Sequence, residues 1–440
     1  MKYSVITFGC RVNQADSLGF EEELRAAGAE AVAAPAADVV IVNTCSVTAT
    51  SDQGARQTIR RIARDNPSAR IVVTGCYATR RPDEVAALPN VVQVISNDDK
   101  PRLLSVLNGQ QAESAERAQK NVFSATVARP GVASRSGDGP CGATLEPGIA
   151  GRTAFTLRVQ TGCAEPCSYC IIPSTRGRPR SVPVQDLLRE VERVAASGFK
   201  EIALTGVHLG SFGRDLDPPG SLIQLLQHLD SWSAKASAER VLFRISSLEP
   251  MDCSREIVDL VANSPSFAPH FHLPLQHASN RVLSAMRRPY TIEYYSALVD
   301  EIRRRLPHAS IGSDIIVGFP GEADDDFEQL ASYLEASPLT HIHVFPYSDR
   351  PGTAASTMSG KVSGAVIRER GRRVREIGGR LTARFRDVQV GTTHRALTLE
   401  DGSLVVTGNY QKLRIPPGLP RNQWVLVRVT SHDDGELLRG

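Results

Sequence analysis

The sequence lacks the features that mark membrane proteins and disulfide-stapled secreted domains. No apolar stretch approaches the roughly 20 residues that a membrane-spanning helix needs, and the opening MKYSVITFGC indicates a strand rather than a cleavable signal. Eight cysteines in 440 residues are too few for a disulfide framework. We therefore expect a cytoplasmic protein with no membrane contact, whose grouped cysteines serve metal binding or catalysis.

The sequence also lacks a strong excess of charge of one sign. Its 51 basic and 48 acidic side chains leave a net charge of +3, so the total gives no indication of nucleic-acid binding and only local clusters can. With 41% hydrophobic residues, the chain has enough apolar material for two or three globular cores.

Three β-rich runs in the first hundred residues each end in a cysteine. The runs are YSVITFGC, DVVIVNTC and RIVVTGC, which end at Cys10, Cys45 and Cys76. Helical patterns separate them, and alternating β and α segments predict a parallel sheet. Because the carboxyl ends of parallel strands share one edge, we expect these three thiols to face one crevice. One such cysteine would more often be a structural thiol, but three in the same context favour a common function.

After a stretch rich in Gly, Pro and Ser, the βα alternation resumes over about 200 residues. Its apolar runs are AFTLRVQ, EIALTG, RVLFRIS, HFHLPL, SIGSDIIVGF and HIHVFPY. Six βα units predict a partial barrel with its working groups at the strand carboxyl ends, and a doubly wound sheet is the alternative.

The C-terminal part combines a basic helix with a β-rich tail. Residues 361–386 carry nine Lys or Arg against two Glu, and the β-rich residues that follow suit a small barrel of a kind that often binds RNA. We therefore expect an α/β protein with a parallel-sheet domain (1–110), a linker (111–148), a barrel core (149–385) and a small β-barrel (386–440). Cys141, in the linker, and Cys253 match no motif.

The strongest chemical signal is the C-x3-C-x2-C spacing of Cys163, Cys167 and Cys170. They directly follow a strand, where a loop can wrap three thiolates around one iron-sulfur cluster. A four-iron cluster with three protein thiolates keeps one iron free, as catalytic metal sites keep a position open. The alternatives are a zinc knuckle or a chance cysteine-rich turn, and the lack of a nearby fourth Cys or His disfavours them.

This triad, with Tyr169 before its last cysteine, resembles the signature of the radical S-adenosylmethionine (SAM) superfamily. In that superfamily the free iron binds SAM, and one electron from the reduced cluster cleaves it to methionine and a 5′-deoxyadenosyl radical that abstracts hydrogen. The resemblance therefore implies SAM and a [4Fe-4S] cluster as cofactors, and a low-potential electron donor as a partner.

Further motifs resemble one family within that superfamily, the methylthiotransferases. GCRVNQADS, NTCSVT and GCYA are similar to its amino-terminal motifs, in which the three cysteines hold a second [4Fe-4S] cluster used in sulfur insertion. The resemblance continues through TRGRPRS, TGVHLGSFG, SSLEP, HLPLQHAS, GSDIIVGFPGE and FPYSDRPGTAA to a TRAM-like terminal barrel. It implies a second cluster on Cys10, Cys45 and Cys76, and a sulfur source as a partner.

The resemblance also implies residues for two binding sites. Those expected to line the SAM pocket are Tyr169, Thr205, Gly206, His208, Ser247, Glu249, Gln276 and Asp314. Those expected to bind the substrate are Asn13, Gln14, Arg176, Arg178, Arg180 and Arg350. Guanidinium groups suit phosphates and carboxylates. The alternatives are an ordinary turn for GVHLGSFG, core histidines at positions 208 and 272, and a solvated loop for the first three arginines.

The motif GCRVNQADS is similar to the branch that acts on N6-threonylcarbamoyladenosine in tRNA. We expect a tRNA methylthiotransferase that modifies C2 of this nucleoside next to the anticodon, with the anticodon loop as its partner. Because the last 50 residues carry only six basic against five acidic side chains, RNA would be held by shape, by stacking on Tyr410 or Trp424, and by the basic helix.

Three alternatives are open at this point. Two are enzymes of the same family that act on a ribosomal-protein aspartate or on isopentenyladenosine in tRNA. The third belongs to another class, a non-catalytic RNA-binding iron-sulfur protein that senses redox state.

Overall fold

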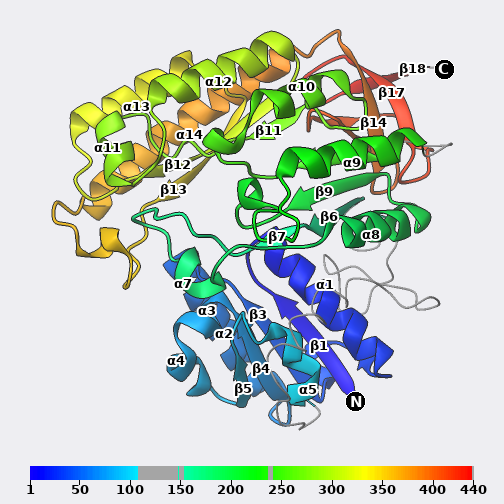
Figure 1. Ribbon diagram of the computed structural model, residues 1–440, viewed down its shortest axis with the longest axis vertical. Helices are drawn as coiled ribbons and strands as arrows, with labels where there is room; N and C mark the ends of the chain where they lie inside the picture. The colour runs from blue at the N-terminus through cyan, green and yellow to red at the C-terminus, as the bar shows by residue number, and fades with distance from the viewer. Residues whose placement is uncertain (108–146, 148–152, 236–240, 439–440) are drawn as a thin grey trace.

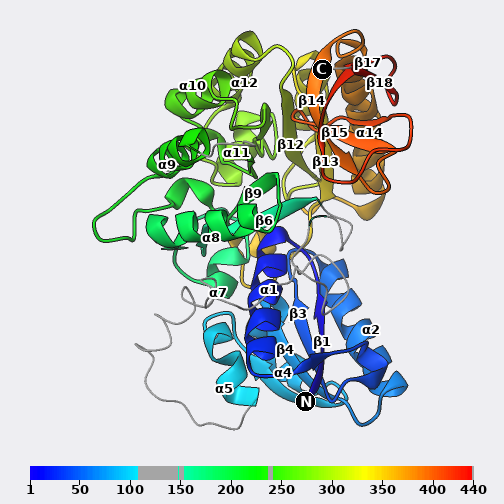
Figure 2. The same ribbon diagram turned by 90° about the vertical axis from the view of Figure 1, so that its right-hand side faces the viewer.

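The computed structural model describes residues 1–107, 147, 153–235 and 241–438. The expected linker, with Cys141, lies outside the described residues except for position 147. Figure 1 places the amino-terminal sheet below a larger central barrel, and Figure 2 shows the C-terminal strands beside the long helix α14. No helix in the described ranges is both long and apolar enough to cross a bilayer.

The amino-terminal segment forms a five-stranded parallel sheet in the order β2-β1-β3-β4-β5. Its central strand is buried throughout, as expected when helices cover both faces of a parallel sheet. Val40 and Val42 pack with α2 on one face, and Val39 and Ile41 pack with α1 and α5 on the other. The elements are β1 (Lys2–Thr7), α1 (Arg11–Ala26), β2 (Glu30–Ala31), β3 (Val39–Thr44), α2 (Ala49–Asp65), β4 (Arg70–Gly75), α3 (Cys76–Arg80), α4 (Pro82–Ala86), β5 (Val91–Ile95) and α5 (Leu103–Leu107).

The central segment contains two three-stranded parallel sheets, in the orders β10-β9-β6 and β11-β12-β13. Isolated parallel bridges, Phe243 with Phe267 and Ser247 with His272, connect the two. The strands follow chain order without the reversal of a doubly wound sheet, which confirms the partial barrel.

Helices cover the outside of this barrel. In α8, for example, Leu187, Val191 and Val194 recur at helical spacing and are buried. The elements are β6 (Ala154–Arg158), β7 (Gln160–Thr161), α7 (Ile172–Arg176), β8 (Arg180–Ser181), α8 (Val184–Ala196), β9 (Glu201–Thr205), α9 (Leu222–Lys235), β10 (Leu242–Ile245), α10 (Arg255–Asn263), β11 (His270–His272), α11 (Asn280–Ala285), α12 (Ile292–Arg305), β12 (Ser310–Val317), α13 (Asp324–Ala336) and β13 (His341–Pro346).

The C-terminal strands form a curved antiparallel sheet in the order β16-β15-β14-β17-β18, after helix α14 (Gly364–Asp387). Much of the positive charge of α14 is neutralised within the protein, by pairs such as Arg370 with Glu322, Arg373 with Glu328 and Arg380 with Glu335. The strands are β14 (Thr393–Leu399), β15 (Leu404–Thr407), β16 (Lys412–Arg414), β17 (Trp424–Val429) and β18 (Gly435–Leu438).

A buried carboxylate joins the amino-terminal sheet to the barrel. Asp16 on α1 accepts hydrogen bonds from Lys100 at 2.6 Å and from Arg158, and Arg176 lies 3.5 Å away. Burial by itself would raise the pKa of Asp16, but the three cations outweigh it and hold this pKa well below its usual range. The contact between the amino-terminal sheet and the barrel, called the junction below, therefore depends on one negative charge among three positive charges.

We expect Asp16→Ala to lower the free energy of unfolding by about 3 to 5 kcal/mol, because it leaves buried cations without a counter-charge. Asp65→Ala is the matched control, because the exposed pair of Asp65 with Arg64 contributes about 1 kcal/mol at most. Urea unfolding at pH 7 measures both, and equal losses would contradict the assignment. Because the folded pKa of Asp16 is lowered, its contribution is present above about pH 4 and is lost as the pH falls further.

Candidate active site with two cysteine triads

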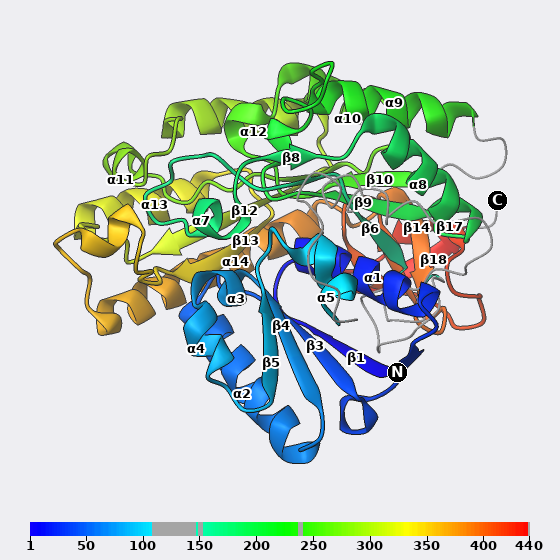
Figure 3. The same cartoon turned by 60° about the horizontal axis from the view of Figure 1, so that its bottom comes forward.

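Cys10, Cys45 and Cys76 lie at the carboxyl ends of three adjacent parallel strands, β1, β3 and β4. Figure 3 shows these strands side by side below the barrel. Burial raises the pKa of Cys45 to about 11, and the Cys10 and Cys76 thiols add to this rise. The three thiols are thus close enough to interact, as the parallel topology predicts. We refer to them as the amino-terminal triad.

A glycine with positive φ precedes two of these cysteines. A Cβ atom on Gly9 (φ +91°) would lie 2.4 Å from the Cβ atom of Cys45, and one on Gly75 (φ +96°) would lie 2.2 Å from the carbonyl oxygen of Thr44. Glycine is needed at both positions, for its backbone conformation and for its lack of a side chain. The two G-C pairs therefore bring neighbouring strand ends together.

Arg176 belongs to the barrel segment, and its positive charge lies next to the amino-terminal triad. This buried side chain on α7 donates hydrogen bonds to the side-chain oxygen of Asn13 and to Thr161 Oγ1, the latter at 3.2 Å. Its guanidinium also interacts with the Cys76 and Cys10 thiols. Thr161 lies two residues before Cys163. The Arg176 side chain therefore joins the segment that leads to Cys163 with the amino-terminal triad.

Arg350 approaches the same triad near Cys45. It is buried and donates a 2.9 Å hydrogen bond to Asp52, which also accepts from Arg80 and Ser46. Its Nε and Nη2 atoms are buried and have no hydrogen-bond partner among the described residues, and its guanidinium interacts with Cys45. Three thiols beside unpartnered donors fit an anionic iron-sulfur cluster, whose thiolates and sulfides accept hydrogen bonds.

Four expected substrate residues, Asn13, Gln14, Arg178 and Arg180, lie around this junction. Asn13 is buried, and its amide donates to the carbonyl oxygens of Phe8 and Thr44. Arg180 bonds to Asp98 at 2.8 Å, Gln14 is half-buried and Arg178 is exposed. Substrate binding by these residues stays a prediction.

Arg176 and Arg350 were expected to meet the substrate, yet each is only 3% exposed and pairs within the protein. Their charge partners, Asp16 for Arg176 and Asp52 for Arg350, lie more than 150 positions away in the chain, so no local pattern reveals the pairing. Arg178 is the one member of the arginine group of TRGRPRS with an exposed side chain.

Cys163, Cys167 and Cys170, the barrel triad, lie in a loop after β7. Gly162 (φ +79°) lies against the backbone of Arg178. A Cβ atom on Gly162 would lie 2.0 Å from the Arg178 carbonyl oxygen, so only glycine fits there. Burial raises the pKa of Cys163 to about 11 and that of Cys170 to about 12. The three thiols interact with one another, so they fit a cluster that binds by displacing their protons.

Arg288 is a residue of this site that the sequence did not reveal. It is buried, donates a 3.2 Å hydrogen bond to the Cys167 sulfur and pairs with Glu249, which was expected in the SAM pocket. Arg288 also donates to the Tyr290 hydroxyl at 3.1 Å. It thus joins a triad thiol to a SAM-pocket candidate, although it belongs to none of the motifs that carried the resemblance.

The other SAM-pocket candidates lie at or near the carboxyl ends of the barrel strands. Thr205 ends β9, Ser247 follows β10, Gln276 follows β11 and Asp314 is within β12. The Gln276 backbone N–H bonds to the Asp314 carbonyl oxygen at 2.8 Å, and Gln276 has a φ of 68°, which non-glycine residues adopt rarely and often at functional sites. The structure therefore brings these candidates to one end of the barrel.

His208, Gly206 and Tyr169 lie close to the barrel triad or its loop. His208 Nε2 is 3.8 Å from Glu165, within the loop, and 3.3 Å from Asp252. A Cβ atom on Gly206 would lie 3.0 Å from Gln160 Oε1, and Tyr169 packs into an apolar cluster that includes Phe319. Roles of these residues in SAM binding stay predictions.

Gln160 is a second residue that sequence reasoning missed. It is fully buried, accepts hydrogen bonds from the backbone N–H groups of Val207 and His208, and donates to the carbonyl oxygen of Gly162. Its amide thereby fixes the cysteine loop against the GVHLGSFG turn. A single glutamine at a strand end carries no distinctive sequence signal.

The two aromatic residues expected to stack on RNA both contact arginines. The Arg244 guanidinium lies 4.3 Å from the Tyr410 ring centre, and His270 stacks on the same ring at 5.2 Å. Arg395 lies 3.9 Å from the Trp424 ring centre. Tyr410 is still 45% exposed, so stacking on RNA stays a prediction.

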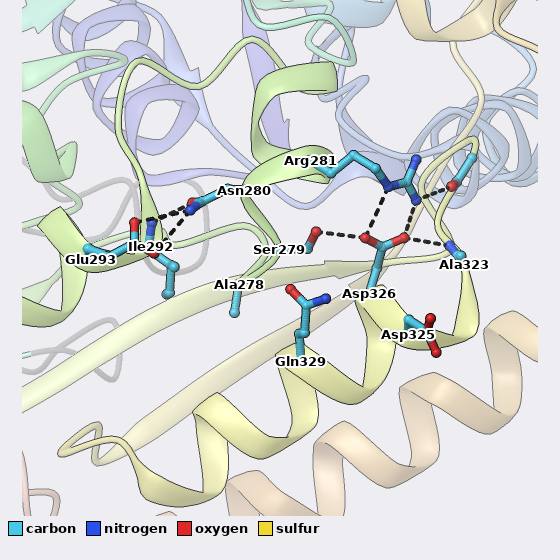
Figure 4. A pocket seen from close by; sticks show the side chains of 11 residues that line it. Ala278, Ser279, Asn280, Arg281, Ile292, Glu293, Ala323, Asp325, Asp326 and Gln329 are labelled. Carbon is cyan, nitrogen blue, oxygen red and sulfur yellow. Dashed lines mark hydrogen bonds and ion pairs between the residues drawn. The ribbon is translucent and has the colours of Figure 1, made fainter.

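Figure 4 shows a pocket between the starts of the helices α11, α12 and α13. Asp326 accepts hydrogen bonds there from Ser279, Arg281 and the backbone N–H of Ala323. The Asp326 carboxylate is thus already paired within the protein, and it fixes the start of the helix.

We expect Arg288→Ala to reduce cleavage of SAM to 5′-deoxyadenosine by at least about tenfold, because loss of a residue that orients a metal ligand has effects of this size. The substitution removes the hydrogen bond to Cys167 and leaves Glu249 without its partner. Arg304→Ala, which breaks an exposed pair with Glu301, is the control. Iron content and 5′-deoxyadenosine are measured in both variants, and equal yields would contradict this role.

Comparison with known proteins agrees with the order of motifs along the chain. The model described as "Uncharacterized protein family UPF0004" matches residues 2–97, and the radical SAM superfamily model matches residues 157–334. Among solved structures, the radical SAM methyltransferase TsrM from Kitasatospora setae, with cobalamin and a [4Fe-4S] cluster bound, has a TM-score of 0.56 at 15% identity, over 81% of this chain and 74% of that chain. At this identity the likeness indicates the fold alone.

Relatives of known name are similar over nearly the whole chain. The threonylcarbamoyladenosine tRNA methylthiotransferase of Aquifex aeolicus is 37% identical over 93% of this chain and 95% of its own length, and that of Bacillus subtilis is 34% identical over 86% and 80%. A ribosomal protein uS12 methylthiotransferase of Saccharopolyspora erythraea is 34% identical over 92% and 86%.

These matches confirm an enzyme with SAM and an iron-sulfur cluster as cofactors, which removes the non-catalytic sensor from the alternatives. The chain belongs to the radical SAM methylthiotransferase family, whose members transfer a methylthio group.

Proposed function

We propose that this enzyme adds a methylthio group to C2 of N6-threonylcarbamoyladenosine next to the anticodon of tRNA. The observation that carries the proposal is the convergence of Cys10, Cys45 and Cys76 beside Arg176 of the barrel. Sulfur insertion needs a second thiolate site that communicates with the radical site. The names of the Aquifex and Bacillus relatives favour the threonylcarbamoyl substrate.

The barrel triad would hold the [4Fe-4S] cluster that binds SAM, and the amino-terminal triad would hold a second [4Fe-4S] cluster. When bound, these groups supply hydrogen abstraction, sulfur and the methyl group. Arg288 would keep Cys167 and Glu249 in position by donating to both. Arg176 and Arg350 would stabilise negative charge at the second cluster, because both interact with its thiols.

Substrate RNA would approach the junction between the two triads. Arg178 is exposed beside the barrel-triad loop, where its guanidinium suits an RNA phosphate or the threonylcarbamoyl carboxylate. The proposed partners are the tRNA anticodon loop, a low-potential electron donor and a sulfur source. A tRNA-modifying role places the enzyme in the cytoplasm.

The second candidate function is modification of a ribosomal-protein aspartate, since the relatives named for that reaction reach 34% and 35% identity. A synthase named for dimethylallyladenosine in tRNA reaches 32% identity. All these relatives match about nine-tenths of this chain, so overall similarity leaves the substrate to experiment.

Iron content tests the second cluster. Anaerobically reconstituted wild-type protein should bind about eight iron atoms per chain, which corresponds to two four-iron clusters. Simultaneous Ala substitution of Cys10, Cys45 and Cys76 should leave about four, with SAM cleavage retained and product lost. Cys253→Ala is the control, because this buried thiol lies outside both triads. An unchanged iron content in the triple variant would contradict the second cluster.

Nucleoside mass spectrometry of tRNA tests the substrate. We expect a strain lacking this gene to lose 2-methylthio-N6-threonylcarbamoyladenosine, and the wild-type gene to restore it. The Cys163→Ala variant should not restore it, because the barrel triad would lose a cluster ligand. An unchanged level of this nucleoside, together with loss of the methylthio group from a ribosomal protein, would overturn the substrate in favour of the second candidate.

A further inference from the structure

Three adjacent barrel strands place histidines and one aspartate on the same face of their sheet. In register, His272 on β11 lies beside Gly312 on β12, and Gly312 lies beside His341 on β13. Two residues further along, Asp314 pairs with His343. Since alternate residues of a strand share a face, these side chains all project from one side of the sheet.

The Asp314 carboxylate lies between two imidazole rings. Its Oδ1 atom is 3.0 Å from His272 Nε2 and 3.2 Å from His343 Nδ1. Each of these three residues offers one ligand atom to a common point, and the three atoms lie within 4.8 Å of one another. One small cation could therefore contact all three after minor adjustment.

Gly312 makes room for this arrangement. A Cβ atom there would lie 2.1 Å from His341 Nε2 and 2.9 Å from His272 Nδ1. Because glycine has no side chain, the His272 and His341 rings can lie over β12 with their centres 6.1 Å apart. The absence of a side chain at this position is thus what lets the rings gather around Asp314.

Solvent reaches the cluster from the β13 side. The side chain of His343 is 60% exposed and that of Asp314 is 25% exposed, whereas that of His272 is 13% exposed. A carboxylate flanked by imidazoles favours a cation over an anion, since the carboxylate would repel an anion. The cluster of His272, Asp314 and His343 therefore offers three ligand atoms, room for the imidazole rings and a path for an ion from solvent.

We propose that His272, Asp314 and His343 bind one divalent first-row transition-metal ion. Two imidazole nitrogens and one carboxylate oxygen suit ions such as Fe²⁺, Mn²⁺ and Zn²⁺, and three protein ligands leave coordination positions open. The competing explanation is a hydrogen-bonded network in which Asp314 only accepts from the two rings. The site contains none of the triad cysteines, although it shares Asp314 with the SAM-pocket candidates, and it goes beyond the proposed function.

Binding of Mn²⁺ to the reconstituted enzyme tests the proposal. With its clusters oxidised, the protein is titrated anaerobically with Mn²⁺, and free Mn²⁺ is followed by electron paramagnetic resonance. We expect about one tight site per chain, weakened at least about tenfold in His343→Ala, which loses a ligand. Gly312→Ala should weaken it similarly without removing a ligand, because its methyl group displaces the rings.

The control is His228→Ala, which removes an exposed histidine on α9 and should leave the tight site unchanged. Iron content and circular dichroism are measured for every variant to show that fold and clusters persist. Absence of a tight site in wild type, or equal affinity in wild type, His343→Ala and Gly312→Ala, would overturn the proposal.

Asp314 is also a SAM-pocket candidate, so the test variants change His343 and Gly312 instead, and Mn²⁺ binding and tRNA modification are measured separately. A tight Mn²⁺ site in an enzyme that leaves tRNA nucleosides unchanged would overturn only the substrate. Normal tRNA modification by an enzyme without such a site would overturn only the metal proposal.

Discussion

The buried guanidinium of Arg176 links the chain segment that leads into the barrel triad to the amino-terminal triad. It reaches from the barrel to Asn13 and Asp16 on α1, and it interacts with thiols of the amino-terminal triad. A buried cation requires compensating partners, and Asp16 supplies the charge while Asn13 and Thr161 supply oxygens. The position of the amino-terminal sheet against the barrel is therefore tied to the electrostatics of the proposed cluster site.

The two triads sit in different strand contexts, because β7, which precedes the barrel triad, pairs antiparallel with β8. The amino-terminal thiols follow neighbouring strands of one sheet, whereas the barrel triad occupies a single loop after one strand. For the amino-terminal triad, the carboxyl ends of the parallel strands β1, β3 and β4 supply an edge where loops converge. Glycines at positions 9, 75 and 162 let the backbone pass at distances that any side chain would block.

Reaction class and substrate depend on different parts of the molecule. In the proposed reaction, the six triad cysteines, with Arg288 and Arg350 beside them, would serve the cluster chemistry whatever the acceptor. Relatives named for RNA and for protein substrates accordingly match this chain to similar extents. Under the proposed function, the substrate would instead be read by exposed groups such as Arg178.

The sequence by itself determined the class of fold, the two triads and the family, because strand periodicity and cysteine spacing are local patterns. The six barrel strands and the strand-end position of each amino-terminal cysteine were predictable in this way. Only the tertiary structure decided which arginines are buried, since Asn13 and Asp16 beside Arg176, and Asp52 beside Arg350, lie more than 150 residues away in the chain. It likewise decided the gathering of His272, Asp314 and His343, which depends on the register between three strands, a quantity that no local pattern encodes.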